Sequence, residues 1–355
     1  MINKEITIKQ KVNFIIESDR NFKKFKNINL NNYPKIFLFV DKKFYNLNKF
    51  FLKNIGNKKY NKIFLKKIDS NEGIKELNIF EKYTKYLIKK NCSKHDLLIA
   101  IGGGTIIDLV GFVSSVFLRG VKLFLIPTNL IGMADASTAG KTGLNSGKLK
   151  NLIGTIYLPE KVYINTNFLK TCSANDLRQG WSEIFKYGLL GSKKLINMID
   201  YYFKYQRERF LLDIIKETIN IRLKIMKINP LASNLGHTFG HALEKITNNK
   251  ITHGDAVSIG TVFALKFANK EKIISKKKID KIISLMKNIG LFTHTNIKIN
   301  PNTLLKYMLK DKKSYDNKVG LILIKDIGKP KIDNFSPFYY CEKKKMLSFL
   351  KTITR

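Results

Sequence analysis

Short apolar runs in the first half of the chain are separated by stretches with helical periodicity. Four of these runs predict buried strands, at residues 36–40, 62–65, 97–101 and 123–127, and residues 108–118 predict a helix. Strands that alternate with helices are typical of a mainly parallel sheet covered by helices. The first part of the chain is therefore predicted to be a Rossmann-like α/β domain.

From about residue 169 the pattern becomes helical, with few strand candidates. Helices are predicted at residues 176–190, 211–228, 237–248, 256–270 and 278–289. Only residues 318–325 again predict a strand, within a hairpin. We place a domain boundary within residues 165–169, which predicts an α/β domain over residues 1–167 and a mostly α-helical domain over residues 168–355.

The length and apolar content of the chain suffice for two domains with their own cores. The chain has 355 residues, of which 44% are hydrophobic. The most apolar region, residues 97–131, is interrupted by Asp108, Arg119 and Lys122, so no run is long enough to span a bilayer. The first residues lack the charged-then-apolar pattern of a signal peptide. These features predict a soluble, cytoplasmic protein with no membrane partner.

The net charge is strongly positive, and it has two interpretations. The chain carries 65 Lys+Arg and 27 Asp+Glu, a formal charge of +38. A basic surface of this size is typical of nucleic-acid binding, but these lysines are scattered and come with abundant Ile, Asn and Phe, which indicates a coding bias. We therefore expect no specific nucleic-acid partner, although a basic surface favours an anionic substrate.

The cysteines predict neither a disulfide framework nor a thiolate metal site. Cys92, Cys172 and Cys341 are odd in number, far apart and form no CxxC pair. Free structural thiols are the expected state.

A glycine turn follows the third predicted strand and precedes a predicted helix. Gly102, Gly103, Gly104 and Thr105 would let a dinucleotide pyrophosphate approach the backbone at a helix N-terminus, although a turn of this kind often only connects strand to helix. Asp41, at the end of an earlier strand, is positioned to accept hydrogen bonds from an adenosine ribose. As a strand-end residue it is equally suited to capping a turn.

Histidines cluster in the second half of the chain. His237 and His241 are four residues apart and share one face of a predicted helix, and His253 follows shortly after. Three protein ligands with an open position are typical of a catalytic zinc site. Glu183 lies in an apolar helix where a buried carboxylate needs a partner, which is either a metal or Lys186.

Residues 135–151 are dense in polar groups and have almost no hydrophobic periodicity. Their glycines predict a loop, and their lysines suit an anionic, polyhydroxylated ligand. A solvated loop is the alternative, which we retain for Lys148.

These motifs together resemble the 3-dehydroquinate synthases, within the superfamily that holds glycerol-dehydrogenase-like enzymes. The resemblance is strongest over residues 102–188 and 234–260. It is carried by the Gly102 turn with Asp108, by residues 118–121, 140–143 and 150–154, by residues 183–188 and by residues 234–241. It implies a phosphate-eliminating lyase of aromatic amino acid biosynthesis, a homodimer, and an active site in the cleft between the two domains.

The resemblance also implies roles for individual residues. Zinc, or Co²⁺ in its place, would be bound by Glu183, His237 and His253. NAD⁺ would be bound by Asp41, Glu72, Lys75, Gly102, Gly103, Gly104, Thr105, Asp108, Thr128, Asn129, Lys141, Lys150, Phe168 and Thr171. The catalytic set would be Asp135, Lys141, Asn151, Lys186 and His241, and the substrate would also be bound by Arg119, Lys150, Lys224, Asn234 and Lys312, with Lys313 competing with Lys312 for this role.

The implied reaction leaves NAD⁺ unchanged over one turnover. NAD⁺ takes a hydride from C5 of 3-deoxy-D-arabino-heptulosonate 7-phosphate as the hydroxyl on that carbon is oxidised, phosphate is eliminated, and the hydride returns. The ring then opens, and an intramolecular aldol step closes the carbocycle of 3-dehydroquinate.

The sequence departs from the family pattern at several positions. Asn129, Ala136 and Ala139 replace usual residues near the expected cofactor site, and Pro230 stands where the family has a substrate-binding Arg. Arg222 or Lys227 is placed to compensate. The alternatives are a cyclase acting on a seven-carbon sugar phosphate without a carboxylate, a metal-dependent polyol dehydrogenase, and a nucleic-acid-binding protein.

Overall fold

The computed structural model describes residues 11–56, 62–147, 149–229, 231–332 and 336–354. The chain divides into two compact units, Met1–Thr171 and Cys172–Arg355. The boundary predicted from sequence lies a few residues earlier, inside a turn of 3₁₀ helix, η4 (Thr166–Thr171), that belongs to the first unit.

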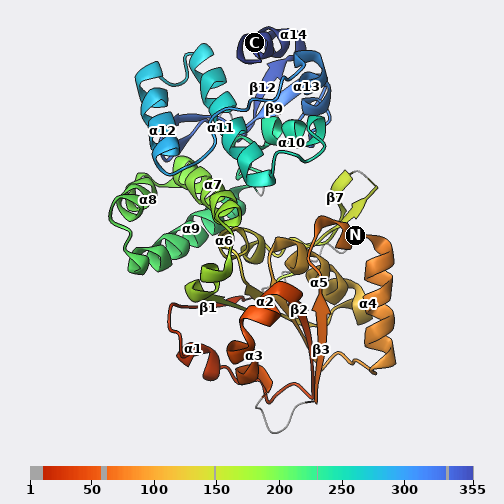
Figure 1. Ribbon diagram of the computed structural model, residues 1–355. Helices are drawn as coiled ribbons and strands as arrows, with labels where there is room; N and C mark the ends of the chain where they lie inside the picture. Colours follow the sequence, from red (N-terminus) through yellow and green to blue (C-terminus); the bar gives the residue numbers. More distant parts are fainter. Residues whose placement is uncertain (1–10, 57–61, 148, 230, 333–335, 355) are drawn as a thin grey trace, which may run out of the picture. The chain divides into compact units, whose positions relative to one another are not determined.

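A six-stranded sheet forms the centre of the first unit, and Figure 1 shows it in the red to yellow part of the chain. Its order is β1-β8-β5-β4-β2-β3, and every neighbouring pair is parallel. The strands are β1 (Asn13–Glu17), β2 (Lys35–Asp41), β3 (Lys62–Ile68), β4 (Leu97–Gly102), β5 (Lys122–Pro127) and β8 (Lys161–Asn165).

Helices and one hairpin complete this unit. The α-helices are α1 (Lys23–Lys26), α2 (Lys42–Leu47), α3 (Lys49–Gly56), α4 (Leu77–Lys89), α5 (Gly104–Val116) and α6 (Leu130–Ala134). Shorter 3₁₀ turns are η1 (Glu72–Ile74), η2 (Phe117–Arg119) and η3 (Ala136–Thr138). The antiparallel hairpin is β6 (Leu144–Ser146) with β7 (Leu149–Ile153).

The core of this unit follows from continuous apolar runs. Every residue of β4 is buried, as expected for a parallel strand covered on both faces. Aromatic rings also pack edge to face between α3 and η4, where the centroids of the Phe51 and Phe168 rings are 4.9 Å apart. The buried core therefore fixes the positions of the carboxyl ends of the central strands, where ligands of open α/β sheets bind.

The four predicted strands are confirmed, and the errors lie around them. The helix predicted at residues 108–118 begins at Gly104 because Gly103 occupies its N-cap, and it ends at Val116 because Leu118 has a φ of 50°. Strands β1 and β8 and helix α4 were not predicted from the apolar pattern. The loop predicted at residues 135–151 is wrong in part, since it contains η3, β6 and the start of β7.

The second unit is mostly helical and contains two short antiparallel strand pairs among its described residues. Its helices are α7 (Ala174–Gly191), α8 (Lys193–Tyr205), α9 (Glu208–Ile228), α10 (His237–Ile246), α11 (His253–Lys270), α12 (Lys276–Asn288), α13 (Pro301–Met308) and α14 (Lys343–Ile353). Strand β9 (Lys318–Leu321) pairs with β12 (Tyr339–Glu342), and β10 (Ile324–Asp326) pairs with β11 (Lys329–Pro330), both antiparallel.

All five helices predicted in this half are confirmed. Helix α11 begins at His253, not at residue 256, and α8, α13 and α14 were not predicted. The single strand predicted at residues 318–325 is two strands, β9 and β10. Among the described residues, no helix combines the length and apolar character needed to cross a membrane. The three cysteines are free, as predicted.

Candidate active site

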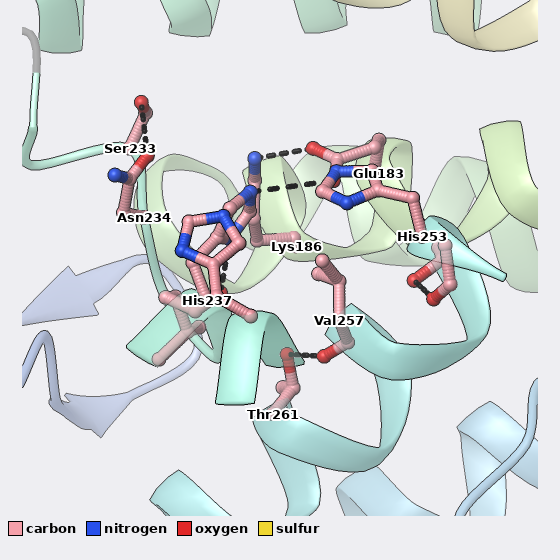
Figure 2. Close-up of polar contacts among 12 residues, drawn as sticks. Glu183, Lys186, Ser233, Asn234, His237, His253, Val257 and Thr261 are labelled. Carbon is pink, nitrogen blue, oxygen red and sulfur yellow. Dashed lines mark hydrogen bonds and ion pairs between the residues drawn. The ribbon is translucent and has the colours of Figure 1, made fainter. Parts of the chain in front are cut away.

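Three side chains from three helices of the second unit converge on one point. Glu183 lies on α7, His237 begins α10 and His253 begins α11 (Figure 2). Glu183 Oε1 lies 3.6 Å from His237 Nε2 and 3.5 Å from His253 Nε2. The ligand atoms of the three residues all lie within 4.8 Å of one another. This is the set that the family resemblance implied as metal ligands.

Glycines bring these helices close enough for the side chains to meet. A Cβ on Gly254 would lie 2.4 Å from Gln179 Cα, so α11 starts directly against α7. A Cβ on Gly260 would lie 2.3 Å from the Gly236 carbonyl oxygen, so α10 and α11 also touch through their backbones. Gly236 itself has a φ of 77°, a conformation that glycine adopts at little cost.

The two histidines of this set, His237 and His253, each have a hydrogen-bond partner on the ring nitrogen Nδ1, which orients the ring. His237 Nδ1 lies 3.1 Å from the Leu235 carbonyl oxygen, which can only accept. His253 Nδ1 lies 3.3 Å from Glu244 Oε2. Each ring therefore carries its proton on Nδ1 when neutral and presents the Nε2 lone pair toward Glu183. Such partners fix metal-binding histidines in proteins.

The ionisable side chains at this point shift one another's pKa values. Burial raises the pKa of Glu183, but the charges of Lys186 and His253 outweigh burial and lower it to about 2. Burial lowers the pKa of His253, but Glu244 and Glu183 outweigh burial and raise it to about 10. Burial, together with the nearby cations, lowers the pKa of His237 well below its usual value.

A metal ion fits these residues. Lys186 forms an ion pair with Glu183 Oε2, so the alternative partner considered from sequence is present. Glu183 Oε1 is buried and has no hydrogen-bond partner in the part of the chain that the structure describes. A buried oxygen is costly to leave unpaired, and a cation between it and two imidazole nitrogens would satisfy it. Two histidines and one carboxylate are a known zinc ligand set.

His241 lies beside this centre but is not part of it. Its ring is 5.3 Å from the His237 ring, one helical turn along α10. Its Nδ1 lies 3.0 Å from Asp311 Oδ2, and Lys313 Nζ lies 2.5 Å from Asp311 Oδ1. Lys313 is thus buried in an ion pair, whereas Lys312 is exposed. Lys312 is therefore the better placed of the two to meet a ligand.

Several of the predicted cofactor residues lie at the carboxyl ends of β2, β4 and β5 in the first unit, namely Asp41, the Gly102–Gly104 turn, Thr128 and Asn129. Gly103 is the N-cap of α5, and a Cβ there would lie 2.7 Å from Asn129 Nδ2. Asn129 caps α6 by accepting a hydrogen bond of 2.9 Å from Gly132 N. Asp41 caps α2 by accepting one of 2.7 Å from Phe44 N, so the capping role considered from sequence is present.

Lys75 joins the cofactor residues to the hairpin. Its buried ammonium lies 2.7 Å from Asp108 Oδ2 on α5 and donates to Asn151 Oδ1 on β7. The Lys75 carbonyl accepts a hydrogen bond of 2.6 Å from Asn145 N. Asn145 Nδ2 also donates to Glu72 Oε1 at 3.0 Å. The structure thus brings four predicted site residues, Glu72, Lys75, Asp108 and Asn151, into one network.

The other predicted site residues differ in exposure. Arg119 is exposed on η2 with a φ of 59°, and Lys224 is exposed on α9. Phe168 is 1% exposed inside the aromatic core, so its side chain is not available to a ligand. Those that are buried or half-buried are Thr105, Thr128, Asp135, Lys141, Lys150, Thr171 and Asn234. Pro230 and Lys148 lie outside the described residues.

Two acidic residues of the site were missed from the sequence. Glu244 orients His253, and Asp311 binds His241. Glu244 follows His241 by one helical turn, which is a signal that a carboxylate lies near the histidine cluster. Asp311 lies on a distant loop, and nothing in its local pattern connects it to α10.

Comparison with solved structures gives the class of fold. The chain is similar to 2-deoxy-scyllo-inosose synthase, solved with carbaglucose-6-phosphate, NAD⁺ and Co²⁺, with a TM-score of 0.84, 20% identity and 96% coverage of both chains. It is equally similar to a 2-epi-5-epi-valiolone synthase from Streptomyces hygroscopicus subsp. jinggangensis 5008, solved with NAD⁺ and Zn²⁺, with a TM-score of 0.85, 20% identity and 99% coverage of both. A probable glycerol dehydrogenase from Sinorhizobium meliloti 1021 follows with a TM-score of 0.66, 13% identity and 96% coverage of both. The fold is that of the sugar phosphate cyclases and related dehydrogenases.

Sequence relatives narrow this class to one family. The 3-dehydroquinate synthase N-terminal model matches residues 65–179, and the C-terminal model matches residues 180–314. A 3-dehydroquinate synthase from Clostridium tetani is 35% identical over 328 residues, covering 88% of this chain and 86% of the relative. One from Vibrio atlanticus is 35% identical over 274 residues, covering 74% and 76%. The chain belongs to the 3-dehydroquinate synthase family, and it is accordingly an enzyme of the phosphate-eliminating cyclase type.

Proposed function

We propose that this chain converts 3-deoxy-D-arabino-heptulosonate 7-phosphate to 3-dehydroquinate and phosphate. The observation that carries the proposal is the convergence of His237 and His253 on a buried Glu183 oxygen that has no hydrogen-bond partner among the described residues, in a chain of this family. The network of Lys75, Asp108 and Asn151 beside the glycine turn supports a cofactor site in the first unit.

The cofactors of the proposed reaction are NAD⁺ and zinc, with Co²⁺ able to fill the same ligand set. Glu183, His237 and His253 would hold the metal. The turn at Gly102–Gly104 would hold the NAD⁺ pyrophosphate, because the N–H groups that begin α5 point toward it. The two related cyclases solved with NAD⁺ and a divalent metal support this pairing.

This chain's own side chains would position the substrate and move its protons. When bound, NAD⁺ supplies hydride acceptance and return, and zinc polarises the hydroxyl that is oxidised. His241 Nε2 would accept the proton of that hydroxyl, because its Nδ1 is already engaged by Asp311. The Lys186 ammonium, held by Glu183, would orient the same oxygen.

Cationic side chains would hold the two anionic ends of the substrate. Arg119, Lys141 and Lys150 suit the phosphate, since a phosphate prefers several charged donors. Lys224, Asn234 and Lys312 suit the carboxylate and hydroxyl groups. Asp135 and Asn151 would accept and donate hydrogen bonds to the sugar hydroxyls. These assignments rest on the family resemblance and on the exposure of each residue.

Three further features belong to the proposal. The chain would act as a homodimer in the cytoplasm, as its relation to biosynthetic synthases supports. Residues 1–167 would bind NAD⁺, and residues 168–355 would bind the metal and part of the substrate. Size-exclusion chromatography with light scattering tests the dimer.

The central test follows both products and the cofactor. Protein loaded with NAD⁺ and Zn²⁺ is given the heptulosonate phosphate, and phosphate and dehydroquinate are assayed together. Equal release of both, with no accumulation of NADH, is expected because the hydride returns within each turnover. Accumulation of NADH in step with product would show a dehydrogenase and defeat the proposal.

The metal ligands are tested by metal analysis. His253→Ala removes one of three ligands and should lower the zinc content of purified protein severely. His294→Ala, on a histidine outside the centre, is the matched control and should keep full zinc. Full zinc with unchanged activity in His253→Ala would remove His253 from the ligand set.

A second candidate function is motivated by Pro230, which supplies no donor where the family has an Arg. A cyclase acting on sedoheptulose 7-phosphate, which lacks the carboxylate, would not need that Arg. Arg222, one possible replacement, is buried and donates from Nε to Tyr187 Oη at 2.8 Å. Loss of one charge-assisted hydrogen bond costs about 1.5–3 kcal/mol, so we expect kcat/KM for the carboxylate substrate to fall by about one to two decades without loss of turnover. Faster phosphate release from sedoheptulose 7-phosphate would favour the second candidate.

A further inference from the structure

His241 is held differently from the two histidines of the metal centre. Although it shares α10 with His237, its nitrogens do not join the converging ligand set. Its side chain is 38% exposed, whereas that of His237 is 10% exposed. Its Nδ1 points inward to Asp311 Oδ2 at 3.0 Å. The remaining nitrogen, Nε2, is therefore the one available to a ligand.

Asp311 is fixed in place before any ligand arrives. Its Oδ1 accepts hydrogen bonds from Lys313 N at 3.0 Å and from Lys313 Nζ. The Lys313 side chain is 0% exposed and that of Asp311 is 3% exposed. Strand β9, which follows the loop that carries them, is tied to α10, because Thr238 Oγ1 donates to the Gly320 carbonyl oxygen at 2.8 Å. The two oxygens of Asp311 thus have separate partners on opposite sides.

We infer that Asp311 is a positioning residue that sets the tautomer of His241 for proton transfer. A carboxylate only accepts hydrogen bonds, so Asp311 requires the His241 proton to be on Nδ1. The Nε2 lone pair then faces outward and can take a proton from a substrate hydroxyl. Lys313 balances the charge of Asp311. The inference rests on the proposed role of His241 in the reaction.

A contribution to folding stability is a poor explanation for the buried ion pair of Asp311 and Lys313. A buried ion pair contributes little net stability compared with apolar side chains of similar size. Orientation explains both the pair and its position, since each oxygen of Asp311 is used for one contact. The same logic, in which a buried carboxylate fixes the tautomer of a catalytic histidine, operates in the serine protease triad.

The substitution Asp311→Asn tests the tautomer of His241 without a large change in structure, because asparagine has nearly the same size and shape as aspartate. Lys313 donates twice to the Oδ1 position, so the amide oxygen must stay there. The amide NH₂ then replaces Oδ2 and faces His241 Nδ1. A donor at that point forces Nδ1 to accept, which moves the ring proton to Nε2. The nitrogen that should accept a substrate proton would then already carry one.

The experiment combines kinetics with histidine ¹⁵N spectra of the zinc- and NAD⁺-loaded protein. With 5 histidines in the chain, each signal can be assigned by single His→Gln variants. In Asp311→Asn we expect His241 to change from the Nδ1–H to the Nε2–H tautomer. We expect kcat to fall about a hundred-fold, the lower end of the contribution that acid–base catalysis makes, with KM changed by less than about two-fold. Asp311→Glu, which keeps the carboxylate, should recover part of kcat.

Controls separate this inference from a loss of fold or of function. Asp316→Asn makes the same change at an exposed position of the same loop and should leave kcat, zinc content and spectra unchanged. An unmoved His241 tautomer, or a kcat that falls only in proportion to lost zinc, would overturn the inference. If His241→Gln keeps full activity, the proposed role of His241 itself fails. If His241→Gln is impaired and Asp311→Asn is not, only the inference fails.

Discussion

At the scale of single residues, the three metal-ligand candidates differ in the proton each carries before a metal binds. Glu183 has a lowered pKa and is ionised at neutral pH. His237 has a pKa well below its usual value and is neutral. His253 has its pKa raised to about 10 by Glu244 and Glu183, so it holds a proton that a metal must displace.

Zinc binding near pH 7 should therefore release about one proton per chain. The released proton comes from His253, because a pKa raised in the metal-free protein means that the ring is charged below pH 10. The release should persist through neutral pH and disappear as the pH rises through about 10. Calorimetric titration of metal-free protein with Zn²⁺, in two buffers of different ionisation enthalpy, measures the number.

Glu244→Gln provides the comparison for this prediction. It removes the largest contribution that raises the pKa of His253, so the proton release at neutral pH should fall. Release of two protons in the unaltered protein would show that His237 is also charged, which would contradict its lowered pKa.

Residue types and spacing were enough to predict some residues of the site, but not the acidic residues that orient its histidines. Glu183, His237 and His253 have side chains that a metal requires, and the family resemblance added their roles. Asp311 contacts His241 only because the chain returns to α10 through a loop. A contact between residues this far apart depends on packing, which a local pattern of apolar and polar positions does not encode.

At the scale of elements, the metal centre depends on how closely α10 and α11 approach. Gly260 on α11 lies against the Gly236 carbonyl and the Gly240 amide of α10, with no space for a side chain. Each helix places one histidine in the centre. A small increase in the distance between these helices would therefore separate His237 from His253.

Gly260→Ala should lower both stability and zinc affinity. The added Cβ would lie 2.3 Å from the Gly236 carbonyl oxygen, so the backbones must move apart. Overpacking of this kind costs about 1–3 kcal/mol, which corresponds to a fall in Tm of roughly 2–12 °C for a unit of this size. Thermal unfolding and zinc titration measure the two effects.

The control for this prediction lies on the same helix. Lys266→Ala changes an exposed position of α11 and should leave Tm and zinc affinity nearly unchanged. Equal zinc affinity in Gly260→Ala and the unaltered protein would show that the centre tolerates movement of α10.

The hairpin of β6 and β7 is held in place by Lys75, and this can be tested by hydrogen exchange. Lys75→Met removes the cation that binds Asp108 and Asn151. Loss of one charge-assisted hydrogen bond costs about 1.5–3 kcal/mol, so amides of residues 144–153 should exchange at least about ten times faster. Lys85→Met, which breaks an exposed pair with Glu81, is the control and should not change the hairpin.

The same hairpin shows why some elements could not be predicted. Strand β4 is wholly apolar, so its burial is evident in the sequence. Residues 144–153 have no such run, and Asn145 within them is held by Lys75 and Glu72, which it meets only in the folded chain. Edge strand β1 has a weak pattern for a similar reason, since only one of its sides pairs with a neighbour, β8.

At the scale of the whole molecule, the charge of +38 is distributed over both units. Many lysines lie on exposed helix faces, such as Lys276, Lys277 and Lys278 at the start of α12. Scattered positive charge attracts any polyanion at low salt but does not discriminate between nucleotide sequences.

We therefore expect binding to duplex DNA to be weak and unspecific. Affinity should fall steeply between about 50 and 200 mM salt, and heparin should compete as well as DNA. A gel-shift titration at physiological salt, with both competitors, measures this. Tight binding that prefers DNA over heparin would contradict the coding-bias interpretation of the charge.

The spread of the metal ligands along the chain also determines when a metal can be captured. As the chain emerges during synthesis, Glu183 appears first, and His253 follows only after three further helices, α8, α9 and α10, have been made. The three side chains converge on one point only after α7, α10 and α11 have packed together. Zinc bound by these three residues would therefore be acquired only after the second unit has folded, because the unfolded chain offers no preformed three-ligand site.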